Sequence, residues 1–268
     1  MFINYYKIIL LFLLNNKRLT IFLLSQINSE VVLPRNPSKI KGVIFDLDGT
    51  LIDTQGLYDE ANQILINKYG NGKIYTPEYQ MITHGTSPAF GNRFIIEQFQ
   101  VNITLEKYIE LKDKYISERV SKCKAMEGAE ELTKNLKHKY GLKSAIATSS
   151  YKESVDSKLS VHKKWIDSDF DMIITGEDKR IKSGKPSPDI FILAANSLGL
   201  KPEECIIFED SMNGIKAAMS SGAGIVVGLP ADINTKYTME IFQYDMYKTR
   251  FIILNSLKDF DYSVLEQS

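Results

Sequence analysis

Two aspartates separated by one residue follow a strongly apolar stretch near the start of the chain. Asp46 and Asp48 lie in the sequence FDLDGT, directly after the run Val43-Ile44-Phe45. Side chains two apart on a strand share a face, so both carboxylates can point at one ligand. Gly49 then lets the backbone turn away and approach that ligand closely. A pair of this kind can hold a divalent cation or transfer protons.

Taken alone, this spacing also fits an Asx-type turn, a calcium loop or the metal-holding pair of a nucleotide-sugar transferase. A calcium loop requires glycine at its sixth position, where this chain has Leu51. A nucleotide-sugar transferase needs a donor-binding domain before the acidic pair, and we expect too few residues before Asp46 to form one.

Hydroxyl side chains follow a second apolar run. Thr148 and Ser149 come at its end, where side-chain hydroxyls and free backbone N–H groups at a helix start can bind an anion. Ser150 with Glu153 fits a capping box, so we expect Ser150 to cap that helix. Thr148 lies before the helix and is free to bind a ligand.

A lysine and two further acids complete the set. Lys185 lies between glycine and proline before a helix, and Glu209 and Asp210 end another apolar run. With Asp46 and Asp48 there are four carboxylates against one lysine, and like charges ~5 Å apart repel by roughly 3 kcal/mol at an effective dielectric constant of about 20. A cation bound by oxygen ligands alone relieves this repulsion, which favours Mg²⁺. Such a centre accepts a phosphate, and we favour a catalytic site over a structural acid cluster.

These residues follow short, continuous apolar runs that are typical of strands buried on both faces of a parallel sheet. Helical patterns lie between the runs, so we expect an α/β fold with a mainly parallel sheet. The carboxyl ends of its strands would bring the motifs together. The expected strands span residues 42–47, 144–148, 172–175, 205–209, 224–227 and 251–254.

The connection between the first two expected strands is far longer than one crossover helix requires. Amphipathic patterns predict helices over residues 57–69, 89–99 and 105–123, separated by turn signals. We therefore expect a core over residues 40–53 and 127–262, with a small helical domain inserted over residues 54–126.

Composition and the first residues restrict the partners. The 268 residues include 33 basic and 33 acidic side chains, so we expect no binding of a nucleic-acid polymer. Two cysteines and three histidines show no ligand spacing, and a reducing compartment, the cytoplasm, is the simpler expectation. Lys17 and Arg18 interrupt the apolar leader (residues 1–39), so we expect no stable membrane span. Residues 1–27 fit either a targeting signal or a disordered segment.

The four motifs, in this order, resemble those of haloacid dehalogenase-superfamily phosphatases. They are Asp46-Leu47-Asp48-Gly49-Thr50, Thr148, Lys185 and Glu209-Asp210, and the resemblance spans residues 40–260. It implies a Rossmann-like core with a helical cap inserted after the first strand. Longer segments, such as GKPSPDIF and FEDSMNG, are similar to the pseudouridine-5'-phosphatase and glycerol-phosphate phosphatase group.

The resemblance also implies a role for each motif. Asp46 would attack phosphorus and form an aspartyl-phosphate, and Asp48 would act as general acid and base. Mg²⁺ would be held by Asp46, the Asp48 carbonyl, Glu209 and Asp210. The phosphoryl oxygens would be bound by Thr148, the Ser149 amide and Lys185.

In the family, the cap selects the substrate, and here Thr54, Tyr58, His84, Gly85 and Thr86 would line the entrance. A solvated turn residue is an equally good interpretation of His84. The β-phosphoglucomutases share the Asp-Thr pair at Thr54 but carry histidine at the position of Tyr58, which favours hydrolysis over mutase chemistry.

We therefore expect a monomeric, Mg²⁺-dependent hydrolase of a small phosphorylated metabolite, such as pseudouridine 5'-phosphate, a glycerol phosphate or a sugar phosphate. A sugar phosphomutase resembling β-phosphoglucomutase is the alternative enzyme. A phosphate-binding interaction module is the alternative without catalysis, although the intact motif set argues against it.

Overall fold

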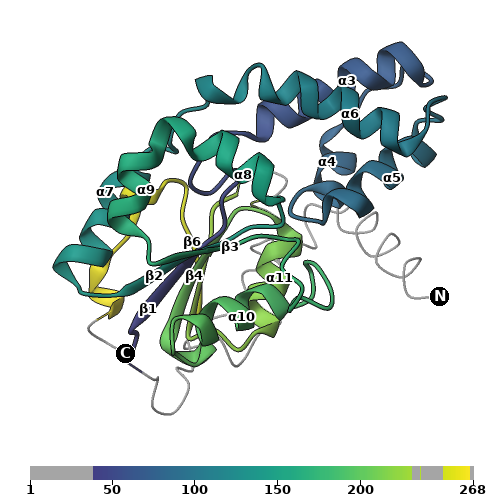
Figure 1. Ribbon diagram of the computed structural model, residues 1–268. Coiled ribbons are helices and arrows are strands. Elements are labelled where there is room, and N and C mark those ends of the chain that lie inside the picture. Colours follow the sequence, from purple (N-terminus) through teal and green to yellow (C-terminus); the bar gives the residue numbers. More distant parts are fainter. Residues whose placement is uncertain (1–38, 231–235, 237–249, 266–268) are drawn as a thin grey trace, which may run out of the picture. The chain divides into compact units, whose positions relative to one another are not determined.

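The structure is a computed structural model that describes residues 39–230, 236 and 250–265 (Figure 1). Apart from Lys39, the expected leader lies outside the described residues, and so does the expected signal or disordered segment over residues 1–27. Every described residue belongs to one compact unit. None of the described helices combines the length and apolar character needed to span a membrane.

A six-stranded parallel sheet forms the centre, with strand order β3-β2-β1-β4-β5-β6. This confirms the expected α/β fold, because each strand coincides closely with one of the apolar runs. The strands are β1 (Gly42–Phe45), β2 (Lys143–Ala147), β3 (Met172–Ile174), β4 (Cys205–Glu209), β5 (Ile225–Gly228) and β6 (Arg250–Ile253).

Helices cover both faces of the sheet (Figure 1). One apolar layer joins the sheet to α7 (Ala129–Lys134), its π-helical continuation η2 (Asn135–Lys139), α8 (Lys152–Leu159) and α9 (Lys163–Asp169). The other layer joins it to α10 (Asp189–Ser197) and α11 (Met212–Ser220). Short 3₁₀ turns occur at η3 (Ser160–His162), η4 (Pro202–Glu204), η5 (Leu257–Asp259) and η6 (Tyr262–Leu265).

Residues 54–126, which we call the helical insert, connect β1 to β2. They form α3 (Gln55–Tyr69), α4 (Pro77–Thr83), α5 (Pro88–Gln98), α6 (Leu105–Ser117) and the 3₁₀ turn η1 (Val120–Lys122). The insert has an apolar cluster of its own, which includes Ile66, Phe99 and Tyr108.

The two chain segments that join the insert to the sheet run beside each other. The Asp53 N–H donates to the Lys124 carbonyl at 2.9 Å, and the Met126 N–H donates to the Leu51 carbonyl at 2.8 Å. These bonds place both junctions next to the end of β1, where the acidic pair lies.

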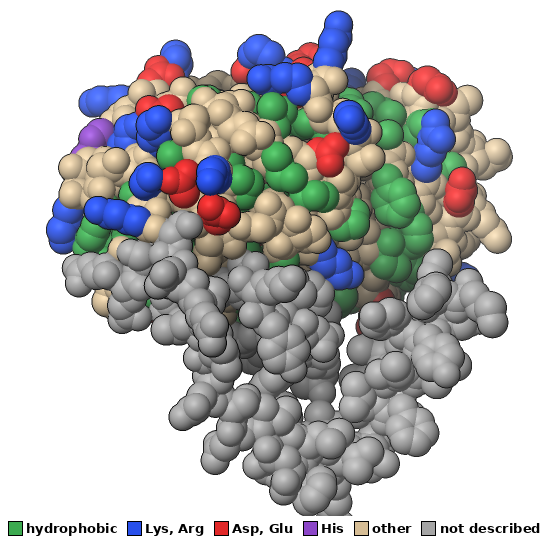
Figure 2. Space-filling view, turned by 90° about the horizontal axis from the view of Figure 1, so that it is seen from below, with side chains coloured by type: hydrophobic (Ala, Val, Ile, Leu, Met, Phe, Trp, Pro, Cys, Tyr) green, Lys and Arg blue, Asp and Glu red, His purple; other side chains and the backbone are tan. Residues whose placement is uncertain are grey.

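Charged side chains of both signs are interspersed on the part of the surface that Figure 2 shows. Lys and Arg groups lie close to Asp and Glu groups there, in keeping with the equal numbers of basic and acidic residues in the sequence.

Candidate active site

The carboxyl ends of β1, β2 and β4 bring three of the four sequence motifs together. β1 pairs with both β2 and β4, so the residues that follow these strands meet at one edge of the sheet. The loop before α10 adds Lys185. Five of the predicted site residues are at most 5% exposed there: Asp46, Thr148, Lys185, Glu209 and Asp210.

Lys185 connects two of the acids. Its Nζ atom lies 2.5 Å from Asp46 Oδ1 and 2.7 Å from Glu209 Oε1, and 3.4 Å from the Ala147 carbonyl. Three acceptors match the three N–H bonds of an ammonium group. The buried lysine is therefore fully engaged, but it supplies one positive charge to three buried carboxylates.

This imbalance shifts the proton affinities of the acids. Burial raises the pKa of Asp46 to about 7; Lys185 opposes the shift, while Glu209 and Asp48 add to it. Burial, followed by Glu209 and Asp46, also raises the pKa of Asp210 well above its usual range. Asp46 and Glu209 raise the pKa of Lys185 although burial alone would lower it. The site thus carries excess negative charge.

Protein donors hold the two acids at the end of β4 in different ways. Asp210 accepts hydrogen bonds from Thr50 Oγ1 (3.0 Å) and Gln55 Nε2 (2.8 Å). The Oε2 atom of Glu209 accepts from the Ser211 N–H (2.7 Å) and hydroxyl (3.0 Å), and its Oε1 atom accepts from Lys185. Both oxygens of Glu209, predicted as a metal ligand, are therefore bound to the protein.

The charge and donor set of this edge fit a magnesium ion. In the described part of the chain, no three His, Cys, Asp or Glu side chains converge as a ready-made metal cage. Mg²⁺ does not require one, because it takes one or two protein carboxylates and completes its shell with water and substrate phosphate. Asp46 and Asp210 are two such carboxylates, and Asp46 Oδ2 has no hydrogen-bond partner among the described residues.

Three donors surround the second aspartate of the pair. Asp48 Oδ1 accepts from Thr54 Oγ1 at 2.6 Å, and Asp48 Oδ2 accepts from Ser150 Oγ and Lys158 Nζ, both at 2.7 Å. The pKa of Asp48 is lowered although burial opposes it, because Lys158 and the hydroxyl donors favour the ionised carboxylate.

The prediction that Ser150 caps the following helix is wrong. Helix α8 begins at Lys152 after Tyr151, one residue beyond the predicted cap. The Ser150 hydroxyl instead donates to Asp48. The side chain therefore belongs to the site and not to the helix end.

The two predicted phosphate-binding residues that follow β2 lie at the same edge. Thr148 Oγ1 accepts a hydrogen bond from the Ser150 N–H at 3.0 Å. The Ser149 hydroxyl donates to the Gly85 carbonyl of the helical insert at 3.1 Å. Ser149 therefore links the core to the insert, while its backbone N–H faces no acceptor recorded among the described residues.

A turn of the insert lies against this edge of the sheet. Asn213 Nδ2 donates to the His84 carbonyl at 2.9 Å, and Gly85 has a left-handed φ of +72°. The His84 ring lies 2.9 Å from Asp59 Oδ1, and the Thr86 hydroxyl donates to the Thr83 carbonyl at 2.6 Å. The backbone at His84 and Gly85 thus contacts the core, whereas the side chains of His84 and Thr86 bond within the insert.

Tyr58 extends from α3 to helix α8. Its hydroxyl lies 3.3 Å from Ser154 Oγ, and Lys158 Nζ lies 5.1 Å from the centre of its ring. Burial raises the pKa of the Tyr58 hydroxyl. Tyr58 was predicted at the entrance. In the structure it contacts Lys158, which in turn contacts Asp48.

Sequence reasoning missed Lys158 as part of the site. A signal was present, since Val155 and Leu159 mark the buried face of α8 and Lys158 lies on that face between them. Gln55 and Asn213 were also missed. Asn213 lies in the family-like segment FEDSMNG, which is a signal, whereas nothing in the local sequence distinguishes Gln55 from a surface amide.

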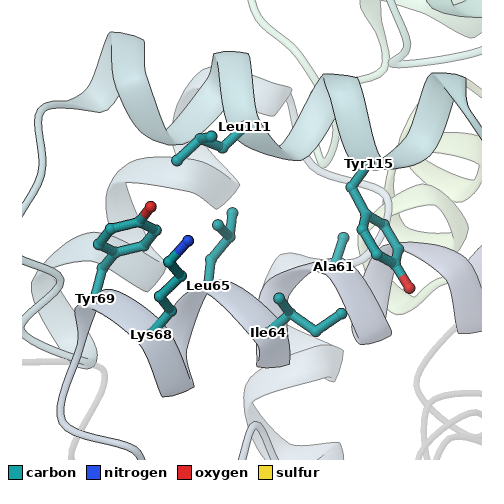
Figure 3. A pocket seen from close by; sticks show the side chains of 7 residues that line it. All are labelled: Ala61, Ile64, Leu65, Lys68, Tyr69, Leu111 and Tyr115. Atoms are coloured by element: carbon teal, nitrogen blue, oxygen red, sulfur yellow. The ribbon is translucent and has the colours of Figure 1, made fainter.

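One groove lies elsewhere, between α3 and α6 of the insert (Figure 3). Seven side chains line it, and none is a predicted site residue: Ala61, Ile64, Leu65, Lys68, Tyr69, Leu111 and Tyr115. The chemistry-bearing residues therefore point to the sheet edge and not to this groove.

Comparisons with known sequences point to one family. The family model for haloacid dehalogenase-like hydrolases matches residues 43–227. A probable pseudouridine-5'-phosphatase of Drosophila melanogaster is 32% identical over 191 residues, which cover 70% of this chain and 81% of the relative. A phosphorylated carbohydrates phosphatase of Thermotoga maritima is 30% identical over 225 residues, or 82% of this chain and 99% of the relative.

Solved structures share the fold. A hydrolase from Entamoeba histolytica superposes with a TM-score of 0.68 at 26% identity and covers 85% of this chain and 98% of its own. A β-phosphoglucomutase from Clostridium difficile superposes with a TM-score of 0.66 at 23% identity, covering 85% of this chain and 96% of its own.

Proposed function

Since the chain belongs to the haloacid dehalogenase-like hydrolase family, we propose that it is a Mg²⁺-dependent phosphomonoesterase that forms an aspartyl-phosphate on Asp46. The similarity to named phosphatases supports hydrolysis of phosphorylated metabolites. The use of Mg²⁺, the aspartyl-phosphate intermediate and the choice of substrate are our proposal. The observation that carries it is the buried contact of Lys185 with Asp46 and Glu209, which holds one oxygen of Asp46 and leaves the other without a partner among the described residues.

In the first step, Asp46 Oδ2 attacks phosphorus and the bond from phosphorus to the leaving oxygen breaks. Because its donors favour the ionised form, Asp48 must first take up a proton in the substrate complex. It then donates that proton to the leaving oxygen, so that an alcohol departs instead of an alkoxide. Thr148 and the Ser149 N–H would bind the phosphoryl oxygens in the transition state. Lys185 would offset their charge, and it could bind one of them by giving up its longest contact, 3.4 Å to the Ala147 carbonyl.

In the second step, Asp48 takes a proton from water as the water attacks phosphorus, and the bond between phosphorus and Asp46 breaks. Inorganic phosphate leaves, Asp46 returns to a carboxylate and Asp48 is protonated again. The two steps together consume one water and one phosphomonoester and yield one alcohol and one phosphate.

Asp46, Asp210 and the Asp48 carbonyl would hold the metal, which would offset negative charge on the site and on the phosphoryl group. We assign Glu209 the role of balancing Lys185, because both of its oxygens already accept protein hydrogen bonds. The carboxylate excess supports this proposal, since buried like charges favour a cation.

The substrate would lie between the sheet edge and the helical insert, which we infer acts as a cap. Tyr58 and the turn at His84 and Gly85 are the insert residues nearest the motifs. The relatives named for pseudouridine 5'-phosphate and phosphorylated carbohydrates support a small sugar-bearing phosphate.

The direct test is phosphate release from a panel that contains pseudouridine 5'-phosphate, glycerol 3-phosphate, hexose phosphates and an aryl phosphate. We expect release that requires both Mg²⁺ and Asp46, with Asp46→Asn as the inactive control. Equal release by wild type and Asp46→Asn would refute the mechanism. Conversion of a hexose 1-phosphate to its isomer without release would instead identify a mutase.

A further inference from the structure

Lys158 occupies an unusual position for a lysine. Its side chain is fully buried on the face of α8 that also carries Val155 and Leu159, two members of the apolar core. Burial of an ammonium group in such surroundings is unfavourable unless the charge is paired and hydrogen-bonded. The partners of this lysine therefore indicate why it is there.

Both recorded partners belong to the acid–base group. Lys158 Nζ lies 2.7 Å from Asp48 Oδ2 and 2.7 Å from Ser150 Oγ, and that hydroxyl in turn donates to the same Asp48 oxygen at 2.7 Å. Lysine, serine and aspartate thus form a closed triangle. It bridges 110 positions of sequence and joins α8 to the turn after β1.

We propose that Lys158 is a positioning residue that holds the Asp48 carboxylate in the orientation from which it exchanges protons. This inference rests on the proposed function, in which Asp48 serves both steps. Asp48 lies on a turn with its side chain 21% exposed, so its carboxylate could rotate without such contacts. The ammonium and the Ser150 hydroxyl fix Oδ2, while Thr54 fixes Oδ1.

Tyr58 connects this ion pair to the helical insert. The Lys158 ammonium lies 5.1 Å from the centre of the Tyr58 ring, in the range of a cation–π contact. The Tyr58 hydroxyl lies 3.3 Å from Ser154 Oγ, and this contact holds the ring against α8. The insert thereby supplies the aromatic surface that keeps water from Lys158, and it strengthens the contact with Asp48.

The test separates the two steps by the choice of leaving group. A dinitrophenyl phosphate has a leaving group that needs no proton, so its kcat/KM reports attack by Asp46 without help from Asp48. Hydrolysis of the aspartyl-phosphate still needs Asp48 as base. We expect Lys158→Met to keep kcat/KM for this ester within about threefold of wild type, while kcat falls by about 100-fold.

Two further readouts follow from the same step. Lys158→Met should release dinitrophenol in a fast burst equal to the enzyme concentration, because the aspartyl-phosphate accumulates. For glycerol 3-phosphate, whose leaving oxygen needs a proton, kcat/KM should fall by about 100-fold. In an Asp48→Asn background, Lys158→Met should cause no further loss, since the lysine acts through that carboxylate.

Lys152→Met is the matched control, because Lys152 lies on the same helix with an exposed side chain and pairs with Asp156. It should leave every parameter unchanged. Ser150→Ala removes a second donor to Asp48 Oδ2 and should show the same pattern to a smaller degree, so the inference remains testable if Lys158→Met does not fold.

The outcomes distinguish this inference from the proposed function. If wild type forms no phospho-enzyme, or Asp46→Asn retains activity, the proposed function fails. If wild type behaves as proposed but Lys158→Met lowers kcat and kcat/KM in parallel for both esters, the lysine is merely structural and this inference is overturned. Unchanged kinetics in Lys158→Met would overturn it as well.

Discussion

The ammonium of Lys185 lies 2.5 Å from the Oδ1 atom of Asp46, and both side chains are buried. The same ammonium lies 2.7 Å from Glu209, so one positive charge serves two carboxylates, with Asp210 beside them. The protein therefore folds around an acid cluster whose charge is only partly balanced. Proton uptake or cation binding must supply the remainder, and the balance between the two can be measured.

Stability of the metal-free protein should fall as the pH rises from about 4 to about 7. The pKa of Asp46 is raised from 3.8 to about 7, so between these values the folded state holds a proton that the unfolded state has released. Unfolding then releases a proton, and the free energy of unfolding decreases with pH by an amount on the order of 3 kcal/mol. Denaturant titrations of wild type and Asp46→Asn isolate this contribution.

Asp46→Asn serves as the control because it cannot ionise at this position. The two proteins should differ little near pH 5, and wild type should become the less stable of the two near pH 8 when no metal is present. Mg²⁺ should reverse that order near pH 8 and have little effect near pH 5, where a proton competes for Asp46. A pH-independent difference between the two proteins would contradict the prediction.

Gly214 leaves room for Glu209. A Cβ atom at Gly214 would lie 1.6 Å from Glu209 Oε1, the oxygen that binds Lys185. Gly214→Ala should therefore break the Glu209–Lys185 contact, lower stability by about 3 kcal/mol and lower kcat/KM by at least about 100-fold. Steady-state kinetics and denaturant unfolding measure both effects.

Gly56 provides the matched control, since it also lies in the first turn of a helix, and a Cβ atom there meets nothing within 4 Å. Gly56→Ala should stabilise the protein by up to about 1 kcal/mol through helix propensity. Wild-type activity in Gly214→Ala would show that Glu209 can move at no cost, contrary to the tight packing described above.

Replacing Gly85 should push the turn at His84 and Gly85 away from the core. A Cβ atom at Gly85 would lie 2.0 Å from the Ser211 hydroxyl, which also binds Glu209. We expect Gly85→Ala to lower kcat/KM by roughly 10- to 100-fold, because the insert can no longer close on the substrate at the right distance. Kinetics on the preferred phosphate from the panel provide the measurement.

Gly72→Ala controls for backbone strain. Gly72 has a φ of +70°, close to the +72° of Gly85, but a Cβ atom there has no neighbour within 4 Å. The two variants share the cost of a left-handed alanine, so any excess loss in Gly85→Ala comes from the contact with Ser211. Equal kinetics in the two variants would remove the proposed role of this turn.

The sequence predicts the positions of the motifs well because apolar runs define buried strands. Asp46 and Glu209 each lie at the end of a run that is buried on both faces, so the edge of the sheet follows from local pattern. The sheet confirms the α/β fold, and the family model confirms the family expectation. The order of strands in the sheet was not predicted, because local patterns do not say which strands pair.

Contacts between distant segments explain what was missed. Ser150 looked like a helix cap, but its hydroxyl donates to a carboxylate 102 positions away in the sequence. Lys158 is a surface residue by type, and only the fold reveals that Asp48 lies opposite it. Helices α4 and α9 also went unpredicted, since each is short. Long-range polar pairing is thus the part of the site that periodicity does not encode.

Lys112 should make stability depend on pH in the alkaline range. It is buried on α6 and donates to Asn92 Oδ1, and no carboxylate of the described residues lies within salt-bridge distance of it. Burial lowers its pKa from 10.5 to about 8, so between these values the unfolded state binds a proton that the folded state lacks. Stability should rise through this window by up to about 1.4 kcal/mol per pH unit.

Lys112→Met removes the buried ammonium and keeps most of the side-chain volume. Its stability relative to wild type should be greatest near pH 7 and should decline as the pH rises toward 10. The free energy of unfolding of wild type rises in this range, whereas that of the variant has no such contribution from residue 112. Lys114→Met, on the exposed side of the same helix, should leave the pH dependence unchanged. Parallel stability curves for wild type and Lys112→Met would mean that the buried lysine keeps its proton, which would require a compensating acceptor that Asn92 alone does not provide.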